Sequence, residues 1–327
     1  MTALSRIAAS GPAPRLTPRT SLTIGLLNNM PDAAMAATER QFGDLLRAAA
    51  GPVEIDLRLF ALDSLPRGER VAALMDGRYE SAAGLAGAEL DGLIVTGNEP
   101  HAPELEQERY WPAMAAVIDW TRAAGVPTIW SCLAAHAAVL RLDSVRRRPL
   151  PAKLSGVFES VALTDDPLLA GAASPFLTPH SRQNGLAEHD LIRSGYDVLT
   201  RSTDAGVDAF VRREGALALF LQGHPEYDAD TLKKEYLRDV GRFLRGERER
   251  HPPPPRRYFG RDGERALETL ANYAIRRPSP DLLSLYAEVL ADARVSQTWR
   301  ASAIGLYHNW LAEAAGMSIA PVDRESV

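Results

Sequence analysis

In the first half of the chain, segments with two different patterns of apolar residues alternate. Short apolar runs at residues 22–27 and 90–97, and alternating apolar and polar residues at 53–60, predict strands. Segments 33–50 and 105–124 carry apolar residues at helical spacing and predict helices. Strands that alternate with helices form parallel sheets with helices on both faces. The sequence therefore predicts an α/β fold with a doubly wound, mostly parallel sheet.

The second half of the chain is richer in strands. Apolar runs predict strands at residues 155–163, 196–200, 209–212 and 216–222. The last two are separated by only three residues and therefore predict a hairpin. A helix is predicted at 228–244, and the acidic residues that precede the two best-defined helices, Asp32 and Asp228, are predicted as their N-caps.

Four consecutive prolines at residues 252–255 favour an extended segment and predict a boundary in the chain. We expect residues 21–250 to form the α/β domain and residues 251–316 to form a helical C-terminal extension packed on it. Helices of the extension are expected at 262–275, 279–292 and 296–315. The flanking segments, 1–20 and 317–327, are predicted to be a mobile leader and a mobile tail.

Charge and hydropathy restrict the classes of partner. The net charge is −5, and the one short block of like charge, at residues 146–148, predicts a solvated turn or a contact with a phosphate. We therefore expect no nucleic acid and no membrane as a partner. No apolar run approaches the ~18 residues that span a bilayer, and residues 1–20 lack the apolar core of a secretory signal, which predicts a cytoplasmic protein.

Cys132 is the only cysteine, which excludes an internal disulfide and a multi-cysteine metal site. It falls where a short β-branched run meets an alanine-rich helical segment. At such a turn the N–H groups of Leu133 and Ala134 and the start of the helix favour a thiolate and can stabilise an oxyanion. Asn98, at the end of a neighbouring strand, is a second oxyanion candidate. The alternative is that Cys132 is a small buried apolar residue.

His224 follows the predicted hairpin, and Glu226 lies two residues further on. A carboxylate beside an imidazole fixes its tautomer and supports its protonated form. Cys132, His224 and Glu226 could thus form a nucleophile, a base and an orienting residue. Such a triad suits acyl transfer from a thioester and also amide hydrolysis, and the triad alone does not choose between them. The alternative is a histidine satisfied within its turn beside a surface glutamate.

Several motifs in the same order resemble the homoserine O-succinyltransferases, a family with the flavodoxin-like, class I glutamine amidotransferase-like fold. The resemblance runs from about residue 22 to residue 311. The motifs are LNNMP (27–31), TERQ (38–41), DGLIVTG (91–97), YWP (110–112), PLPAK (149–153), GVFE (156–159), PHSR (179–182), GHPEYD (223–228), EY (235–236), RD (238–239), WRA (299–301) and NWL (309–311).

The resemblance implies transfer of a succinyl group from succinyl-CoA, through a cysteine acyl-enzyme, to the hydroxyl of L-homoserine, an early step of methionine synthesis. Acyl-CoA would be a cosubstrate, with no tightly bound cofactor and no metal. By position, Cys132 corresponds to the nucleophile, His224 to the base and Glu226 to its partner. Residues at substrate-contacting positions are Lys153, Ser181 and Arg238, and the position that distinguishes acyl donors is His101. Without a substrate role, Lys153 and Arg238 would be ordinary surface cations.

The chain departs from the family pattern near the expected site. The lysine usual after Met30-Pro31 is missing, residues 133–136 (LAAH) replace the usual sequence after the nucleophile, and His101 matches neither common choice. Four alternatives therefore stay open: acetyl-CoA as donor, another hydroxy amino acid such as serine as acceptor, a glutamine amidotransferase-like hydrolase, and a non-catalytic ligand-binding homologue.

Two further histidines, His136 and His180, are predicted to be structural. The apolar residues of the second helix in the extension predict either a homodimer contact or packing in the core; they are Leu282, Leu283, Leu285, Tyr286 and Leu290.

Overall fold

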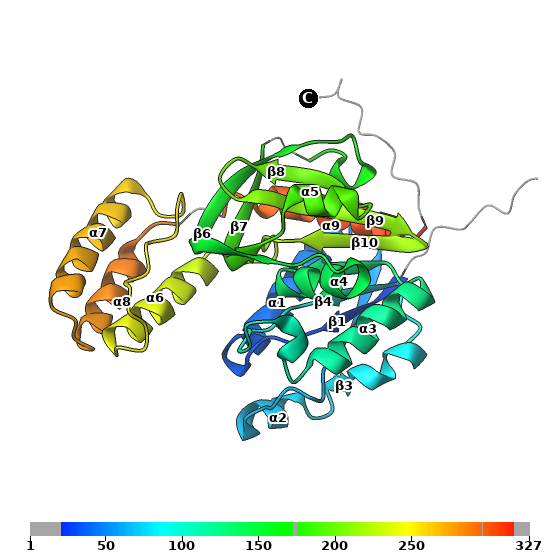
Figure 1. Ribbon diagram of the computed structural model, residues 1–327, viewed down its shortest axis with the longest axis horizontal. Coiled ribbons are helices and arrows are strands. Elements are labelled where there is room, and N and C mark those ends of the chain that lie inside the picture. Colours follow the sequence, from blue (N-terminus) through cyan, green and yellow to red (C-terminus); the bar gives the residue numbers. More distant parts are fainter. Residues whose placement is uncertain (1–20, 173–174, 296, 317–327) are drawn as a thin grey trace, which may run out of the picture.

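A mixed sheet forms the centre of the computed structural model, which describes residues 21–172, 175–295 and 297–316 (Figure 1). Within these residues the sheet has ten strands in the order β3-β2-β1-β4-β5-β10-β9-β8-β6-β7. The strands are β1 (Ser21–Leu27), β2 (Glu54–Ala61), β3 (Tyr79–Ser81), β4 (Gly92–Val95), β5 (Thr128–Ser131), β6 (Arg148–Ala162), β7 (Phe176–Gly185), β8 (Asp197–Ser202), β9 (Gly206–Glu214) and β10 (Ala216–Leu221).

The strands from β3 to β10 in this order run parallel to one another, and β9, β8, β6 and β7 continue the sheet with antiparallel pairing. Every residue of the central strands β4 and β5 is buried. This burial explains their nearly continuous apolar sequences, because a parallel sheet is covered on both faces. The predicted doubly wound, mostly parallel sheet is confirmed.

The helices connect and cover the strands. They are α1 (Asp32–Ala49), α2 (Glu69–Met75), α3 (Trp111–Ala124), α4 (Leu133–Asp143), α5 (Glu188–Arg193), α6 (Thr231–Leu244), α7 (Arg261–Arg276), α8 (Leu282–Asp292) and α9 (Arg300–Ala314), with short 3₁₀ helices η1 (Ala82–Gly87), η2 (Leu105–Gln107) and η3 (Pro167–Leu169). No helix within the described ranges is long and apolar enough to cross a lipid bilayer.

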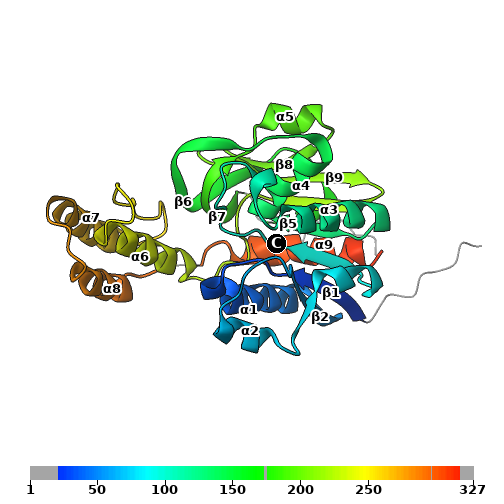
Figure 2. The ribbon, with the colours of Figure 1, turned by 60° about the horizontal axis from the view of Figure 1, so that its bottom comes forward.

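Two apolar clusters lie on opposite faces of the sheet. Figure 2 shows α3 and α4 on one side of the sheet and α1 on the other. On one face, α3 and α4 pack on side chains such as Val95 and Phe220. On the other face, α1 and α9 pack on side chains such as Ile94 and Leu219. Neighbouring residues of one strand thus enter different clusters, as the alternation of side chains along a strand requires.

The helices α6, α7 and α8 form a lobe beside the sheet (Figure 1). Their buried apolar residues make a third cluster, which includes Leu267, Leu270 and Ala274 of α7 at helical spacing. The predicted helices of the C-terminal extension are all present, although residue 296 lies outside the described residues. The extension contributes to two different cores, because α9 returns from the lobe to the sheet.

The apolar residues of α8 pack mainly in the core of the lobe. Tyr286 and Leu290 are buried, and Leu282 and Leu283 pack against the same cluster. Leu285 is exposed. A homodimer contact through this helix stays a prediction. The predicted mobile leader and tail lie outside the described residues.

Both predicted N-caps are wrong by one or two positions. Pro31 precedes α1, so Asp32 is the first helical residue, and its carboxylate accepts a hydrogen bond from Gly68 N at 2.8 Å instead. The N-cap of α6 is Asp230, while the Asp228 carboxylate accepts from Arg40 at 2.8 Å. In both cases the acidic side chain near the helix start accepts a hydrogen bond from a distant segment of the chain.

Two further elements differ from the expected pattern. The helix predicted at 105–124 begins only at Trp111, with Pro112 in its first turn, where a missing N–H costs nothing. Strand β7 was not expected, because its sequence contains Pro179 and many polar residues. It lies at the edge of the sheet, where proline is tolerated in a strand.

Candidate active site

Three strand ends with chemically active residues are neighbours in the sheet. Strands β4, β5 and β10 are parallel and adjacent, so their carboxyl ends open at the same edge. The residues that follow them include Asn98, Cys132 and His224. Ligands of open α/β sheets bind outside this edge of the strands. The topology therefore brings together residues that are far apart in sequence.

Cys132 occupies a sharp turn between β5 and α4. Its backbone has φ 50° and ψ −108°, a conformation that a non-glycine residue adopts at a cost of about 1–3 kcal/mol. Its N–H donates to the carbonyl of Leu221 at 2.7 Å, which fixes the turn to the end of β10. The side chain is partly exposed. Cys132 is thus held at the surface of the sheet edge and is not a buried apolar residue.

The loop after β4 passes very close to the start of α4. A Cβ atom added to Gly97 would lie 2.4 Å from Leu133 Cβ and 3.1 Å from Leu133 N. This contact places the loop beside the first backbone amide after the nucleophile. Asn98 follows directly, and its side-chain oxygen accepts from the N–H of Glu99 at 2.8 Å. Of the two predicted oxyanion contributors, Leu133 follows the nucleophile directly, and Asn98 follows the glycine that packs against Leu133.

His224 and Glu226 form a buried pair. The His224 Nδ1 and Glu226 Oε1 atoms are 2.8 Å apart, and the two side chains are 9% and 5% exposed. The His224 N–H donates to the carbonyl of Pro179 at 2.7 Å, and the imidazole stacks on Tyr227 with ring centroids 4.3 Å apart. Because Glu226 occupies Nδ1, the other ring nitrogen is left for the nucleophile.

The electrostatics of His224 link it to Cys132. Burial alone would lower the pKa of His224. The charges of Cys132 and Glu226, and hydrogen bonds to both side chains, outweigh burial and raise this pKa well above 6.5. The three residues predicted as a triad therefore interact with one another, and the arrangement favours a protonated imidazole beside the sulfur.

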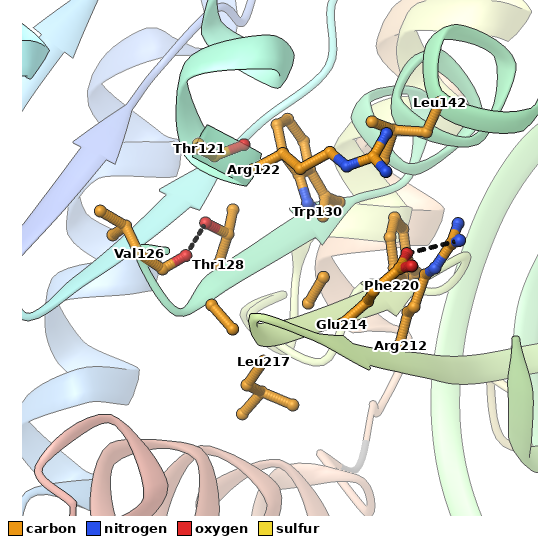
Figure 3. A pocket seen from close by; sticks show the side chains of 12 residues that line it. Thr121, Arg122, Val126, Thr128, Trp130, Leu142, Arg212, Glu214, Leu217 and Phe220 are labelled. Carbon is orange, nitrogen blue, oxygen red and sulfur yellow. Dashed lines mark hydrogen bonds and ion pairs between the residues drawn. The ribbon is translucent and has the colours of Figure 1, made fainter. Parts of the chain in front are cut away.

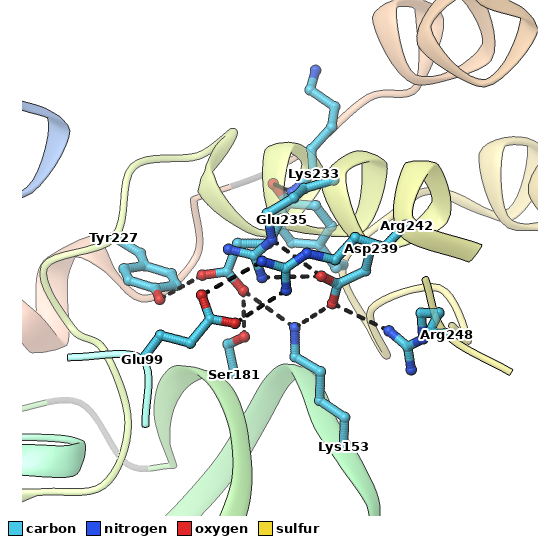
Figure 4. Close-up of polar contacts among 11 residues, drawn as sticks. Glu99, Lys153, Ser181, Tyr227, Lys233, Glu235, Asp239, Arg242 and Arg248 are labelled. Atoms are coloured by element: carbon cyan, nitrogen blue, oxygen red, sulfur yellow. Dashed lines mark hydrogen bonds and ion pairs between the residues drawn. The ribbon is translucent and has the colours of Figure 1, made fainter. Parts of the chain in front are cut away.

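The three predicted substrate-contacting residues also come together, around two carboxylates of α6. Figure 4 shows Lys153 and Ser181 beside these carboxylates, Glu235 and Asp239. Lys153 Nζ donates to Asp239 Oδ2 at 2.7 Å, and Arg238 Nε donates to Asp239 Oδ1 at 3.1 Å. Burial would raise the pKa of Asp239, but these two cations lower it below its usual value. The Ser181 hydroxyl donates to Glu235.

Glu235 connects this cluster to the triad. Its second carboxylate oxygen accepts from the Tyr227 hydroxyl at 2.8 Å, and the Tyr227 ring stacks on His224. The roles of Tyr227, Glu235 and Asp239 were not predicted from the sequence. The available signal was the spacing of Glu235 and Asp239, which puts two acidic residues on one face of a helix.

His101 is exposed in the loop between β4 and η2. Its backbone N–H donates to Glu108 Oε1 at 2.6 Å. The same loop is tied to α6 by an ion pair between Glu99 Oε1 and Arg242 Nη1 at 3.1 Å. The position expected to distinguish acyl donors is therefore on the loop that borders both the nucleophile and the substrate-contacting helix.

The other two histidines lie in the interior. His136 is 2% exposed and its Nε2 lies 3.1 Å from Gln222 Oε1; burial lowers its pKa to about 3. His180 is fully buried, with Nε2 at 3.2 Å from Asp208 Oδ1, and burial lowers its pKa. Both environments suit the structural roles predicted for them.

A separate hollow lies at the opposite, amino-terminal end of β5 and β10 (Figure 3). It is lined by Thr128, Trp130, Arg212 and Phe220, among others. None of the predicted site residues lines it. Among the described residues, no group of three or more His, Cys, Asp and Glu side chains is placed to hold a metal ion.

Comparisons with known proteins give one consistent family. Residues 15–316 match the sequence model of the family described as homoserine O-succinyltransferase. Proteins of that name are similar to this chain in Methylorubrum extorquens (50% identity over 291 residues, 89% of this chain and 86% of the relative), Rhodopseudomonas palustris (46% over 294 residues, 90% and 88%) and Bradyrhizobium japonicum (47% over 277 residues, 84% and 85%).

Solved structures show more distant similarity. A glutamine amidotransferase from Methylobacillus flagellatus is 15% identical, with a TM-score of 0.49 over 92% of this chain and 97% of that one. One from Thermotoga maritima is 13% identical, with a TM-score of 0.48 over 90% and 98%.

Proposed function

This chain belongs to the homoserine O-succinyltransferase family, and from that premise we propose that it transfers a succinyl group from succinyl-CoA to the hydroxyl of L-homoserine through an acyl-enzyme on Cys132. The observation that carries the proposal is the position of Cys132 on its strained turn, which is hydrogen-bonded at 2.7 Å to the end of the strand that precedes His224, whose imidazole Glu226 holds at 2.8 Å. We also propose that the reaction serves methionine biosynthesis in the cytoplasm.

In the first half-reaction the Cys132 thiol gives its proton to His224, and the sulfur attacks the carbonyl carbon of the thioester. A new carbon–sulfur bond forms, and the negative charge that develops on the carbonyl oxygen is stabilised by the backbone N–H of Leu133 and by Asn98. The tetrahedral intermediate then expels the CoA thiolate, which takes the proton from His224. The succinyl group is now a thioester of Cys132, and CoA leaves as a thiol.

In the second half-reaction His224, now neutral, accepts the proton of the acceptor hydroxyl as its oxygen attacks the acyl carbon. The intermediate collapses with Cys132 as the leaving group, and the proton on His224 restores the starting ion pair. Glu226 keeps the imidazole in one tautomer and stabilises its charge in both steps. The product is the succinyl ester of homoserine.

The acceptor would be held by the cluster beside the triad. Arg238 is 48% exposed at its side chain, so its guanidinium is available to form a two-point contact with an amino-acid carboxylate. Lys153 and Ser181 are held toward the same place by Asp239 and Glu235. Acyl-CoA is a cosubstrate in this proposal, and the open edge of the sheet beside Cys132 is where its thioester would be presented.

A panel of donors and acceptors tests the proposal. Release of free CoA is measured with succinyl-CoA or acetyl-CoA, each with L-homoserine or L-serine. We expect the highest kcat/KM for succinyl-CoA with L-homoserine. A higher value for another pair would reassign the donor or the acceptor. Ammonia released from glutamine without CoA would indicate a hydrolase, and ligand binding with no turnover in any pair would indicate a non-catalytic homologue.

A further inference from the structure

The loop of residues 97–102, which we call the donor loop, borders the nucleophile. At its start, Gly97 passes so close to α4 that an added Cβ would overlap Leu133 Cβ at 2.4 Å. Real Cβ atoms do not approach this closely, so the loop lies in van der Waals contact with the residue after Cys132. An acyl group carried on Cys132 is only a few atoms long, and the donor loop is therefore a wall of the space that this group occupies.

The middle of the donor loop has a polar anchor. Glu99 pairs with Arg242 of α6 at 3.1 Å, and the side chains are 45% and 37% exposed. The pKa of Glu99 is lowered, chiefly by its hydrogen bond to Arg242. An ion pair this exposed to solvent contributes little to fixing a loop. A second anchor is needed to hold the loop in one position.

Glu108 supplies that second anchor. It is only 6% exposed, and one of its carboxylate oxygens, Oε1, accepts from the N–H of His101 at 2.6 Å and from the N–H of Ala102 at 2.7 Å. Hydrogen bonds to a buried carboxylate are stronger than those between neutral groups. Because both donors are backbone groups, these bonds fix the path of the chain itself at the end of the donor loop.

The position of Glu108 ties the donor loop to the rigid part of the fold. Its own carbonyl accepts from Trp111 N at 3.0 Å, at the start of α3. Helix α3 packs on the sheet through buried residues that include Met114 and Ile118. The donor loop is thus held between α4 at one end and α3 at the other.

We propose that Glu108 is a positioning residue that fixes the donor loop against the nucleophile and so sets which acyl-CoA the enzyme accepts. The inference rests on the proposed function. A succinyl group is longer than an acetyl group and ends in a carboxylate, so the two donors need different room beside the loop. A shift of about 1 Å in a positioning element can change a rate about 100-fold, and the two donors would not be affected equally.

Two substitutions test the role of Glu108. Glu108→Ala removes both hydrogen bonds, and Glu108→Gln keeps an acceptor oxygen but loses the charge. The matched control is Glu106→Ala, two residues earlier, which is exposed and pairs with Arg146 at 3.0 Å. The first readout is the ratio of kcat/KM for succinyl-CoA to that for acetyl-CoA. The second is the rate at which iodoacetamide alkylates Cys132, which reports on the triad.

We expect Glu108→Ala to move the donor ratio toward one by about tenfold, Glu108→Gln by about threefold, and Glu106→Ala not at all. The alkylation rate stays within about twofold of the unchanged protein in all three, because Glu108 bonds to the far end of the loop, at His101 and Ala102, and not to the triad. If Glu108→Ala does not fold, as judged by circular dichroism, the donor ratio of Glu108→Gln tests the inference alone.

An unchanged ratio in the folded Glu108 variants would overturn the inference, as would a ratio already near one in the unchanged protein. A parallel loss of alkylation would also overturn it, since Glu108 would then act through the triad. These outcomes differ from failure of the proposed function, which would appear as absence of CoA-dependent turnover in the unchanged protein.

Discussion

At the scale of single residues, the chemistry depends on one carboxylate that supports one imidazole. Glu226 lies 2.8 Å from His224 and is almost completely buried, so its charge acts on the ring with little screening by solvent. This charge, with that of Cys132, is what holds the pKa of His224 above 6.5 against the opposing effect of burial. The residue types were predictable from the sequence, because a cysteine, a histidine and a carboxylate occur at strand ends.

Glu226→Gln tests this support. Removing the negative charge lowers the pKa of His224, so the imidazole loses its proton at a lower pH than in the unchanged protein. We expect kcat to fall by roughly 10³ or more, as for carboxylates that orient a catalytic histidine. The histidine titration is followed by NMR, with His224→Gln to assign the signal. Glu249→Gln, at an exposed position, is the control; an unchanged His224 pKa in Glu226→Gln would contradict this role.

Other residues at this scale could not be read from the sequence. Glu235 and Asp239 act through partners that are far away along the chain, Ser181 and Lys153. Glu108 binds the backbone of a loop that begins before it, at His101. An acidic residue on a helix is usually solvated, and only the folded chain shows which ones are buried beside a cation or a backbone amide. The same reason explains why Asp32 and Asp228 were wrongly predicted as N-caps.

At the scale of elements, the site depends on the close contact between the loop after β4 and the start of α4. Strong apolar runs made β1, β4, β5 and β10 predictable, and the alanine-rich segment made α4 predictable. The edge strand β7 was not predictable in this way, because an edge strand needs less apolar burial and tolerates Pro179. Yet β7 supplies both Ser181 and the carbonyl that accepts from His224 N.

Gly97→Ala tests the contact between elements. The added methyl group would overlap Leu133 Cβ at 2.4 Å and must push α4 or the loop aside. We expect a loss of about 1 to 3 kcal/mol in the free energy of unfolding and a fall in kcat of at least about tenfold, because Leu133 follows the nucleophile. The control is Gly84→Ala, where nothing lies within 4 Å. Equal stability and activity of the two variants would show that the loop does not press on α4.

At the scale of the whole molecule, the C-terminal helix α9 covers one face of the sheet that carries the site. Trp310 is fully buried, and a Cβ added to Gly92 of β4 would lie 2.7 Å from its ring. The Trp299 indole, just before α9, donates to the carbonyl of Tyr227 beside the triad at 3.0 Å. The helical composition of this region was predictable, but its division between a separate lobe and the face of the sheet follows from long-range packing.

Trp310→Ala tests whether α9 is part of the core. Removal of a buried tryptophan side chain is expected to lower the free energy of unfolding by about 3–5 kcal/mol, measured by urea titration. Tyr273→Ala, on α7, removes an aromatic side chain that is 50% exposed and should change stability by less than about 1 kcal/mol. A cost for Trp310→Ala as small as that of the control would mean that α9 is only loosely attached.

The central claim is that Cys132 carries the acyl group, and the intact mass of the protein tests it most directly. The unchanged protein and Cys132→Ala are each mixed with succinyl-CoA in the absence of an acceptor, and L-homoserine is then added. We predict that the unchanged protein gains the mass of one succinyl group, that L-homoserine removes it, and that Cys132→Ala gains none. A succinyl adduct that persists in Cys132→Ala and is discharged by L-homoserine would contradict the claim.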